Sequence, residues 1–315
     1  MKILITGGLG FIGSHLLSNL GQIHEIEILD GFTQDYLGFT HIHRGSAGLQ
    51  ETNDIEKKHR NLNLKYRLSL IRDRFTKIHK FYTYNHELRN LEKENYDLII
   101  NCGSLAEAIL AQHYPHFTRV SISGGAENLK IIFPKTPVLH LSSSMVYGTW
   151  EGVIDEQYSL RPVDYYGDRK ARAEIEFGTD DLILRPIHVY GMGDGKFPIW
   201  MNLERQIAAS KPFMLEAASC IYIDDFVLAI KNILDNWKPG IYNISYDFIR
   251  SIEPIKEVYP KNFDYQIKLG PTGKPRGSLD SSKLLNTFNF AFRYKDYEST
   301  IKDYYGKYEN FCKKQ

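Results

Sequence analysis

The sequence predicts an α/β protein with a doubly wound parallel sheet and a smaller C-terminal lobe. Short apolar runs alternate with segments of helical periodicity through the first two thirds of the chain, a pattern typical of βαβ units. A glycine-rich turn follows the first apolar run. From about Pro186 onward, Gly/Pro turns and an aromatic-rich tail replace this alternation. The change predicts a second lobe that is assembled from separate pieces of the chain.

Short apolar runs bounded by polar or turn-forming residues are the expected strands of the sheet. In chain order they are Lys2–Thr6, Glu25–Asp30, Lys80–Tyr84, Asp97–Asn101, Val138–Ser142 and Leu182–Arg185. The connections between them carry helical periodicity. The helices expected there are Phe11–Leu20, Tyr66–Phe75, His86–Glu94, a pair between Leu105 and Ile132, and Tyr166–Phe177. Beyond them, we expect a helix over Asp225–Asn236 and a strand over Gly240–Ile244.

The connection Gly31–Ile78 is far longer than the handful of residues that a βα connection normally needs besides its helix. Its second half is rich in Lys and Arg, and Leu64, Leu68, Ile71 and Phe75 recur there at helical spacing. This pattern predicts an amphipathic helix with a solvated basic face. The alternative is that the basic face contacts an anionic substrate or a partner subunit.

The composition is ordinary for a globular protein, with 43% hydrophobic and 24% charged residues among 315. A chain of this size buries roughly 75% of its unfolded surface, so it needs neither disulfides nor a structural metal. Lys+Arg 39 against Asp+Glu 38 leaves a net charge of +1, which provides no field for binding a polyanion. We therefore expect no nucleic-acid partner.

The cysteines Cys102, Cys220 and Cys312 lie far apart without a CxxC pair, so neither a disulfide framework nor a zinc site is expected. His41 and His43 lack a third metal ligand and are interpreted as a loop feature. The N-terminus reaches glycine before an apolar run of signal-peptide length accumulates, and no later run reaches about 18 apolar residues. These features predict a cytoplasmic protein that binds neither a metal nor a membrane.

The turn after the first strand carries Gly7, Gly8, Gly10 and Gly13, which match both GxGxxG and GxxGxxG. Between a strand and a helix, such glycines let the backbone approach the pyrophosphate of a dinucleotide at the helix N-terminus. Asp30 ends the next strand, where a carboxylate accepts hydrogen bonds from the adenosine ribose hydroxyls and repels a 2′-phosphate. The sequence therefore predicts a Rossmann domain that binds NAD in preference to NADP.

Tyr166 and Lys170 stand four residues apart at the start of an expected helix and therefore share one face. A tyrosine that acts as a base near neutrality needs its phenol pKa lowered by roughly 3 units from about 10. An ammonium roughly 4 to 5 Å away contributes about that much, and the positive charge of an oxidised nicotinamide adds to it. The serines Ser142–Ser144 end a strand at the carboxyl edge, where doubly wound sheets bind ligands.

Together these motifs resemble the extended short-chain dehydrogenase/reductase superfamily, in its NAD-dependent epimerase/dehydratase branch of UDP-glucose 4-epimerase-like nucleotide-sugar enzymes. The resemblance covers nearly the whole chain: TGGLGFIGSHL is similar to the cofactor loop, SSSMVYG to the serine strand, and YYGDRKARAE to the YxxxK helix. LRPIHVYGMGD is similar to the following strand, and IYIDDFVLAI with GIYNIS to the late helix and strand. We expect residues 1–186 and 218–247 to form the NAD-binding domain, and residues 187–217 and 248–315 the substrate-binding lobe.

The resemblance implies a role for each matching residue. Tyr166 is implied as the acid/base, Lys170 as the residue that holds the nicotinamide ribose and tunes Tyr166, and Ser143 as the hydroxyl that polarises the reacting oxygen. A homodimer is also implied, held by the helices between Leu105 and Ile132. The implied cofactor contacts are Gly7, Gly10, Phe11, Ile12, Gly13, Asp30, Tyr166 and Lys170, and the implied contacts to a nucleotide-activated sugar are Ser143, Ser144, His188 and Arg276.

The reaction depends on the residues that follow Ser143. Similar dehydratases and decarboxylases carry an acid one or two residues later, where this chain has Ser144 and Met145. The resemblance therefore favours an epimerase that oxidises the sugar to a transient keto-sugar and returns the hydride to the opposite face. A nucleotide-sugar dehydrogenase, ketoreductase or dehydratase of the same family is one alternative. A catalytically silent NAD-binding regulatory protein is another.

Several positions depart from the pattern that the resemblance implies. The arginine that often binds the nucleotide phosphates is missing from Ala217–Ser219, and His188 replaces the usual Asn before VYG. The Gly-Asp that usually touches adenine is absent from Phe81–Tyr84. Arg276 stands where the family has a second phosphate-binding arginine, although it could equally be a surface loop residue. Arg185 is interpreted as an internal ion-pair partner.

The remaining polar and aromatic candidates are interpreted as structural. Asp224 and Asp225 precede an apolar helix, which predicts an N-cap with a charge suited to the helix dipole. Tyr147 and Tyr190 each stand in a VYG triplet, where we expect a packed ring and a bonded hydroxyl, with substrate contact as the alternative. Nothing near Cys102 marks it as a nucleophile.

Overall fold

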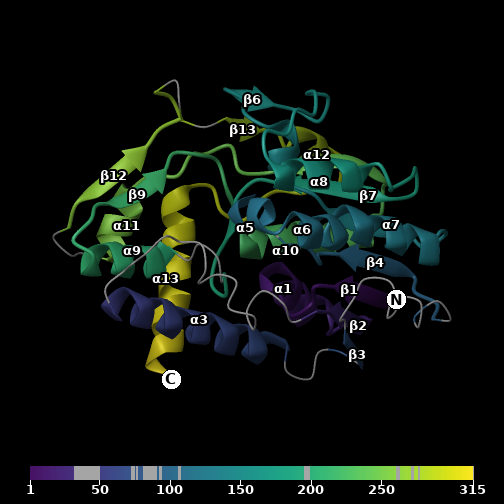
Figure 1. Cartoon of the computed structure of the whole chain (residues 1–315), viewed down its shortest axis with the longest axis horizontal. Coiled ribbons are helices and arrows are strands. Elements are labelled where there is room, and N and C mark those ends of the chain that lie inside the picture. The colour runs from purple at the N-terminus through teal and green to yellow at the C-terminus, as the bar shows by residue number, and fades with distance from the viewer. Residues whose placement is uncertain are drawn as a thin grey trace.

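In this computed structural model the described residues are 1–31, 50–71, 75, 77–80, 91, 94–105, 108–194, 199–259, 263–270, 273–275 and 277–314. The central strands are β1 (Lys2–Thr6), β2 (Glu25–Asp30), β3 (Lys77–Lys80), β4 (Leu98–Asn101), β5 (Val138–Leu141), β7 (Leu182–Pro186) and β11 (Gly240–Ile244). They form a seven-stranded sheet of order β11-β7-β5-β4-β1-β2-β3, in which every neighbouring pair is parallel (Figure 1).

The chain enters this sheet at its middle and extends it in both directions. After β1 it adds β2 and β3 on one side, and it then crosses over to add β4, β5, β7 and β11 on the other. β1 and β4 are paired in register from Ile3 opposite Leu98 to Thr6 opposite Asn101. The winding reverses between these two strands, and doubly wound sheets bind ligands outside the carboxyl ends at this point. The predicted fold class is confirmed.

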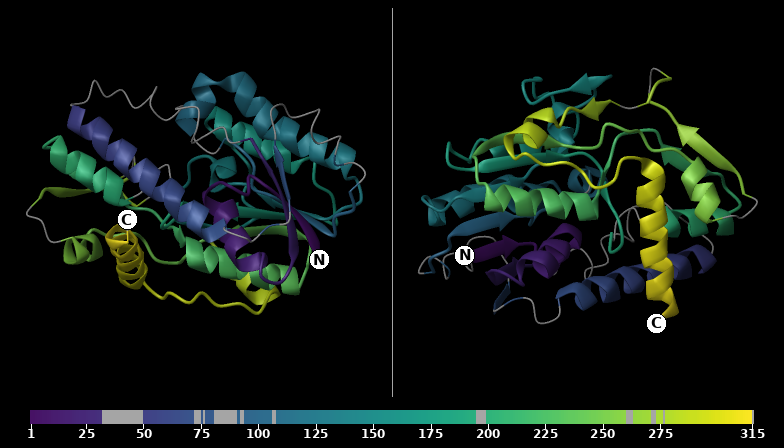
Figure 2. Two further views of the ribbon diagram at one scale, coloured as in Figure 1. Left: turned by 90° about the horizontal axis from the view of Figure 1, so that it is seen from below. Right: turned by 180° about the vertical axis from the view of Figure 1, so that it is seen from behind.

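Helices cover both faces of the sheet, which explains why its strands are continuous apolar runs. They are α1 (Phe11–Leu20), α3 (Gln50–Ile71), α5 (Ala108–His113), α6 (Pro115–Ser121), α7 (Ser123–Ile132), α8 (Tyr165–Glu174) and α10 (Ile223–Asp235). Figure 2 shows α1 and α10 on one face and α5 to α8 on the other. α3 packs against the outer side of α1. Ile3, Leu4 and Ile5 of β1 are accordingly fully buried.

The remaining elements build the smaller lobe and its junction with the sheet. They are β6 (Val153–Ile154), β8 (Val189–Tyr190), β9 (Phe213–Glu216), β10 (Ile221–Tyr222), β12 (Tyr265–Lys268), β13 (Ser278–Leu279), η1 (Ser144–Tyr147), α9 (Ile199–Ala208), α11 (Glu253–Val258), α12 (Ser282–Thr287) and α13 (Tyr297–Lys313). Fully buried Trp200 of α9 contacts the rings of Tyr304, Tyr305 and Tyr308 of α13. The aromatic-rich tail of the sequence therefore forms part of the core of this lobe.

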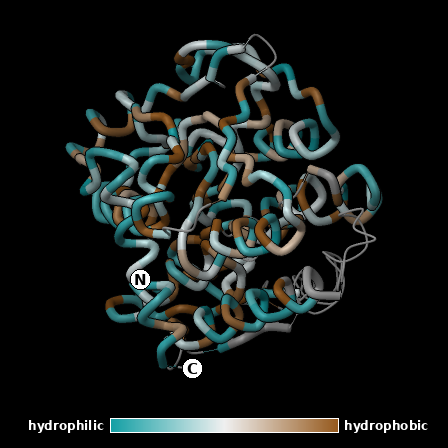
Figure 3. Tube along the Cα trace, turned by 90° about the vertical axis from the view of Figure 1, so that its left-hand side faces the viewer, coloured by the Kyte–Doolittle hydropathy of each residue, from teal (hydrophilic) through white to brown (hydrophobic). Residues whose placement is uncertain are grey.

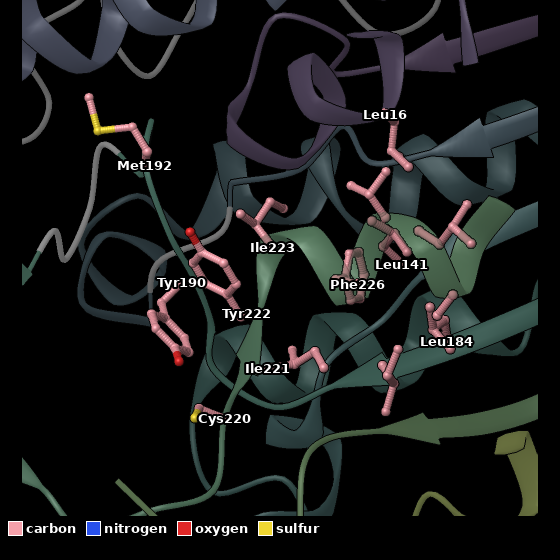
Figure 4. Close-up of a cluster of buried hydrophobic side chains, with 14 of the residues drawn as sticks. Leu16, Leu141, Leu184, Tyr190, Met192, Cys220, Ile221, Tyr222, Ile223 and Phe226 are labelled. Atoms are coloured by element: carbon pink, nitrogen blue, oxygen red, sulfur yellow. The ribbon is translucent and has the colours of Figure 1, made fainter. Parts of the chain in front are cut away.

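One hydrophobic cluster runs from the sheet into the lobe. It contains Leu141 and Leu184 of the sheet, Phe226 of α10, and Tyr190 and Trp200 of the lobe. In Figure 4, Leu141, Leu184 and Phe226 lie close together, and Tyr190 lies apart from them beside Tyr222. Figure 3 shows hydrophobic residues concentrated toward the middle of the trace. The two parts of the chain thus share a core. No helix within the described ranges is long and apolar enough to cross a membrane.

The segment 105–132 and the third strand differ from expectation. Three helices, α5 to α7, replace the expected pair, because Pro115 starts a new helix at a position that tolerates its missing N–H. Ile122 then ends α6 and precedes α7. The third strand is Lys77–Lys80, earlier than Lys80–Tyr84. Residues 81–90, which include most of the expected helix His86–Glu94, lie outside the described residues.

α3 is longer than expected and buries a partly different face. It begins at Gln50, well before the expected start at Tyr66. Leu68 is 50% exposed, whereas Arg67, expected on the solvated face, is 5% exposed, and Asn63 is 4% exposed. The expected pattern holds in part, since Ile71 is buried and Lys57, Lys58 and Lys65 are exposed. The buried face also takes in Arg67 and Asn63, because α3 lies between α1 and α9 and packs against polar as well as apolar groups there.

Candidate active site

The glycine turn joins the carboxyl end of β1 to α1 in a shape that requires glycine at two positions. Gly7 has a φ of +67°, and the Gly10 N–H donates a hydrogen bond to the Gly7 carbonyl at 3.0 Å. A Cβ atom at Gly13 would lie 2.2 Å from the Gly7 carbonyl oxygen, so no side chain fits there. The first turn of α1 carries no acidic residue. Its N-terminal dipole therefore favours an anion at this turn.

Asp30 lies beside this turn, as the sequence predicts. Its carboxylate accepts a hydrogen bond from the Leu9 N–H at 2.9 Å. The bond fixes the carboxylate at the end of β2, next to the end of β1. A negative charge held there suits a ribose diol and opposes a phosphate.

A buried polar network ties the carboxyl ends of β1, β4 and β5 together. The Thr6 hydroxyl donates to Asn101 Oδ1 at 2.7 Å and accepts from the Gly103 N–H at 2.9 Å. Asn101 Nδ2 lies 3.0 Å from His140 Nδ1. Burial lowers the pKa of His140 well below its ordinary value, so the ring is neutral and accepts this hydrogen bond. Sequence reasoning missed the network, although the polar residue inside the apolar run VLHL was a signal for it.

Tyr166 and Lys170 share the buried face of α8, whose start is fixed by Asp164 accepting from the Gly167 N–H at 2.7 Å. Lys170 Nζ donates to the Leu141 carbonyl at 2.7 Å and to the Ser104 hydroxyl at 3.1 Å. It lies 5.9 Å from the centre of the Tyr166 ring. The helix thus brings both predicted residues to the end of β5.

The phenol of Tyr166 is harder to ionise than expected. Burial raises the pKa of Tyr166 to about 12, against the opposing effect of a hydrogen bond with Ser143. Tyr166 is only 8% exposed, and Lys170 directs its ammonium at a carbonyl and a hydroxyl. The expected lowering of this pKa is therefore absent in the protein alone.

Ser143 is placed by the short helix η1. It is the N-cap, and its Oγ accepts a hydrogen bond from the Met145 N–H at 3.2 Å. The same side chain lies near enough to Tyr166 to oppose the rise that burial causes in the pKa of the phenol. Ser143, Tyr166 and Lys170 thus meet at the carboxyl end of β5, and Ser144, which follows in η1, is buried.

A buried ion pair between Arg185 and Glu174 stabilises the elements that carry Ser143, Tyr166 and Lys170. Arg185 donates two hydrogen bonds to Glu174, at 2.9 and 2.5 Å, and a third to the Tyr147 hydroxyl at 2.8 Å. The Ser142 hydroxyl donates to the same carboxylate at 2.5 Å. Tyr147 in turn donates to Asn243 at 2.8 Å. The structural interpretation of Arg185 and Tyr147 is confirmed.

The loop after β8 is held by side chains of α1 and α3. His15 Nε2 lies 2.8 Å from the Met192 carbonyl, and burial lowers the pKa of His15 to about 4, so the neutral ring donates. Asn63 donates to the Asp194 carbonyl at 2.9 Å and accepts from the Gly193 N–H at 3.2 Å. Sequence reasoning missed these contacts, which join segments far apart in the chain.

Other predicted residues lie at the junction of sheet and lobe or outside the described residues. His188 is half-buried, its ring stacks on Tyr190, and its carbonyl accepts from the Ile221 N–H at 3.1 Å. The Tyr190 hydroxyl donates to Thr300 at 2.6 Å, so its structural interpretation is confirmed. Arg276, together with His41 and His43, lies outside the described residues.

The predicted N-cap at Asp224 and Asp225 is wrong. α10 is capped by Tyr222 without a side-chain hydrogen bond, and both acids lie in its first turn, where their charge suits the dipole. Asp225 instead accepts from the Tyr246 hydroxyl at 2.8 Å and from two backbone N–H groups before α13. Asp224 pairs with Lys307 of α13 at 2.6 Å. Both carboxylates therefore bind groups outside α10, and neither caps its N-terminus with a hydrogen bond.

Cys102 is not activated as a nucleophile, as expected. Burial raises the pKa of the Cys102 thiol to about 12, which leaves it protonated and unreactive. Among the described residues, no group of three or more His, Cys, Asp or Glu side chains could hold a metal ion.

Comparisons with known proteins agree with this geometry. A curated relative, an uncharacterized UDP-glucose epimerase of Bacillus subtilis (strain 168), is 27% identical over 253 residues, which cover 74% of this chain and 72% of the relative. The structure resembles UDP-glucuronic acid 4-epimerase from Bacillus cereus in complex with NAD, with a TM-score of 0.76 and 19% identity over 99% of both chains. It also resembles the UDP-Glc/GlcNAc 4-epimerase from Campylobacter jejuni, with a TM-score of 0.69 and 22% identity over 98% of this chain and 99% of that one.

The family model described as "NAD dependent epimerase/dehydratase family" matches residues 3–245, which is more than half of the chain. The match begins in β1, before the glycine turn, and ends just after β11, so it spans the whole central sheet. It therefore includes the turn, the serine strand and the Tyr166–Lys170 helix together. This protein belongs to the NAD-dependent epimerase/dehydratase family.

Proposed function

We propose that this protein is an NAD-dependent epimerase of UDP-sugars that works through a transient keto-sugar. The observation that carries the proposal is the meeting of Ser143, Tyr166 and Lys170 at the carboxyl end of β5, beside the point where the winding reverses. The similarity to proteins described as UDP-sugar 4-epimerases supports the same reaction and suggests UDP as the nucleotide.

The residues of the glycine turn fit NAD. Gly13 has no room for a Cβ atom against Gly7, which leaves the backbone as the surface that meets a pyrophosphate. Asp30, held by the Leu9 N–H, would bind the adenosine ribose. We assign the cofactor contacts to Gly7, Gly10, Phe11, Ile12, Gly13, Asp30, Tyr166 and Lys170. NAD, when bound, supplies the hydride acceptor and donor of the reaction.

Tyr166 takes the proton of the sugar hydroxyl and later returns it, while Ser143 hydrogen-bonds the reacting oxygen. Because burial raises the pKa of Tyr166 to about 12, the phenol needs positive charge nearby before it can act as a base. One unit charge at about 4–5 Å contributes about 4 kcal/mol, or roughly 3 pKa units. Lys170 and the positively charged nicotinamide ring would together lower the pKa of Tyr166 further than one charge alone does.

The residues after Ser143 favour epimerisation over dehydration. Ser144 is 6% exposed and begins η1, and Met145 packs beside the hydrophobic cluster that contains Tyr166. Neither side chain can protonate a leaving group. The keto-sugar is therefore reduced again on its opposite face. A dehydrogenase or ketoreductase of the same family would differ in releasing its cofactor at each turnover.

The Tyr166→Phe variant tests the proposal. It is expected to lose turnover of the UDP-sugar by a factor of about 10² to 10⁴, because the acid/base is gone, and to keep its bound NAD. Turnover is measured by product analysis, and NAD by mass spectrometry of the denatured protein. The Tyr165→Phe variant is the matched control, since Tyr165 is the neighbouring phenol and stacks on Arg169. Full activity of Tyr166→Phe would refute the acid/base assignment.

The two units of the chain divide the ligands between them. We assign the cofactor to residues 1–186 and 218–247, which contain all seven central strands. The sugar nucleotide is assigned mainly to residues 187–217 and 248–315, through His188 and Arg276, and Ser143 and Ser144 at the end of β5 complete its contacts. No nucleic acid or membrane takes part.

A homodimer also belongs to this proposal, formed through the helices between residues 105 and 132. α7 packs on α8; Ile131 of α7 is 66% exposed, and Ile175, just after α8, is 80% exposed. Large exposed apolar side chains of this kind suit an interface between two copies. Analytical ultracentrifugation measures the mass in solution.

The location belongs to the proposal as well. The free cysteines Cys102, Cys220 and Cys312 suit a reducing compartment. We therefore place the enzyme in the cytoplasm, where a fractionation of cells would find it.

A further inference from the structure

Arg250 is a buried arginine in the stretch that follows β11. Its side chain is 6% exposed, and its backbone N–H donates to the Ala218 carbonyl at 3.1 Å. The preceding residue, Ile249, forms an isolated antiparallel β-bridge with Ser219. The Nε atom is fully buried without a hydrogen-bond partner, and no carboxylate in the described part of the chain forms an ion pair with this guanidinium.

A comparison with Arg185 shows that this is unusual. Arg185 is 3% exposed and is neutralised by Glu174. An arginine stays protonated inside proteins, and a buried charge without a counterion is strongly unfavourable. Buried charges in proteins are normally paired, so an anion that binds from outside the chain would supply the missing partner.

A second buried polar group without a partner lies within electrostatic range of Arg250. Tyr297, at the start of α13, is 4% exposed, and its hydroxyl forms no hydrogen bond within the described ranges. Burial raises the pKa of Tyr297, while the charge of Arg250 acts in the opposite direction. Cys220 lies within range of the same charge, and burial raises its pKa to about 12. This cluster of Arg250, Tyr297 and Cys220 therefore provides one positive charge and two neutral hydrogen-bond donors, and it contains no carboxylic acid.

The cluster is connected directly to the edge of the sheet. Cys220 precedes β10, which pairs with β8, and the Ile221 N–H donates to the His188 carbonyl at 3.1 Å. His188 follows the end of β7, the neighbour of the serine strand β5. Figure 4 shows Cys220 and Tyr190 together on the lobe side of Ile221, with Leu141 and Leu184 of the sheet on the other side.

We propose that Arg250 and Tyr297 form an anion-binding subsite that holds the diphosphate of the sugar nucleotide. The guanidinium presents a planar fork of donors that matches phosphate oxygens, and the phenol adds one more donor. The subsite rests on the proposed function, since it assigns the diphosphate of that substrate. It also places a cation next to Ala217–Ser219, where the sequence lacks the arginine that the family resemblance led us to expect.

Calorimetric titration of the full-length protein with UDP and with uridine tests the subsite. Arg250→Gln is expected to weaken UDP binding by about 10- to 100-fold, the loss typical of a hydrogen-bonded charge, and to leave uridine binding and bound NAD unchanged. Arg293→Gln is the matched control, because Arg293 is a half-exposed arginine of the same lobe. Unchanged UDP affinity in Arg250→Gln, or an equal loss for uridine and UDP, would overturn the subsite.

A second variant separates binding from folding. Tyr297→Phe removes only a hydroxyl without a partner, so it is expected to fold normally and to weaken UDP binding by about 5- to 10-fold. Arg250→Met is expected to raise the melting temperature of the nucleotide-free protein, because a charge kept for a ligand costs stability in its absence. A fall in that temperature would point to a structural role instead.

Two outcomes keep this proposal distinct from the proposed function. If the unaltered protein binds no UDP, the substrate class itself is wrong, and the subsite falls with it. If UDP binds equally to both proteins and only a UDP-sugar with a carboxylate loses affinity in Arg250→Gln, the anion is the sugar acid, and the diphosphate assignment is wrong.

Discussion

At the scale of single residues, burial and partners decide what each polar group of the site does. Tyr166 is buried beside the end of β5, and Arg185 is buried in the neighbouring strand β7. The phenol of Tyr166 is kept neutral by burial, whereas Arg185 is kept charged by Glu174. A positive charge that binds nearby would therefore favour ionisation of the Tyr166 phenol, whereas Arg185 has a structural role.

The Glu174→Gln variant tests the scaffold role. It leaves Arg185 buried without a counterion, which is expected to cost about 3–5 kcal/mol of the free energy of unfolding. Urea denaturation measures the loss. Glu176→Gln, an exposed acid just after α8, is the control and should stay within about 0.5 kcal/mol of the unaltered protein. Equal stability of Glu174→Gln and the control would contradict the structural role of the pair.

At the scale of elements, α3 explains why the connection between β2 and β3 is long. The helix extends past α1 to α9, so it reaches the smaller lobe. Asn63 bonds Gly193 and Asp194, and His15 of α1 bonds Met192. α1 and α3 thus hold residues 192–194, which follow β8 and lie close in sequence to His188.

The Asn63→Ala variant tests this contact. Leaving the Gly193 N–H and Asp194 carbonyl without partners is expected to destabilise the protein by about 1–3 kcal/mol. A displaced loop should also weaken binding of the UDP-sugar by about 1 kcal/mol, or roughly fivefold in KM, with kcat nearly unchanged. Steady-state kinetics separates the two constants. Asn61→Ala, on the exposed side of the same helix, is the control, and an equal effect there would argue against the contact.

At the scale of the whole molecule, Glu204 joins three helices. It accepts from Lys58 at 3.1 Å and from Tyr308 at 3.0 Å, and it lies 3.0 Å from His59. These residues belong to α9, α3 and α13. Burial acts to raise the pKa of Glu204, but His59 and Lys58 outweigh it and lower the pKa to about 2 from an ordinary 4.5. The junction of the lobe with α3 therefore depends on an ionised carboxylate.

The pH dependence of stability tests this junction. Because the folded pKa is the lower one, Glu204 contributes up to about 3 kcal/mol above the ordinary value, and this contribution is lost as the pH falls from about 4.5 to 2. Glu204→Gln is expected to be less stable at pH 7, and the difference should vanish near pH 2. Thermal unfolding across this range measures it, with Glu309→Gln of an exposed pair as the control. A constant difference at all pH values would refute the ionic contribution.

The sequence by itself determined the fold class, the bounds of β1, β2 and β11, and the positions of the glycine turn and of the Tyr166–Lys170 pair. These features depend on local patterns: apolar runs, helical spacing and glycines that leave room for close backbone contact. The tertiary structure decided the buried face of α3, the partners of Asp225, the network of Thr6 and the isolation of Arg250. Each of these depends on groups that meet only after distant segments pack, as Asn63 and Asp194 do across 131 residues of chain. Local periodicity carries no information about such encounters, because burial and pairing energies are set by the neighbour across the contact and not by the neighbour in sequence.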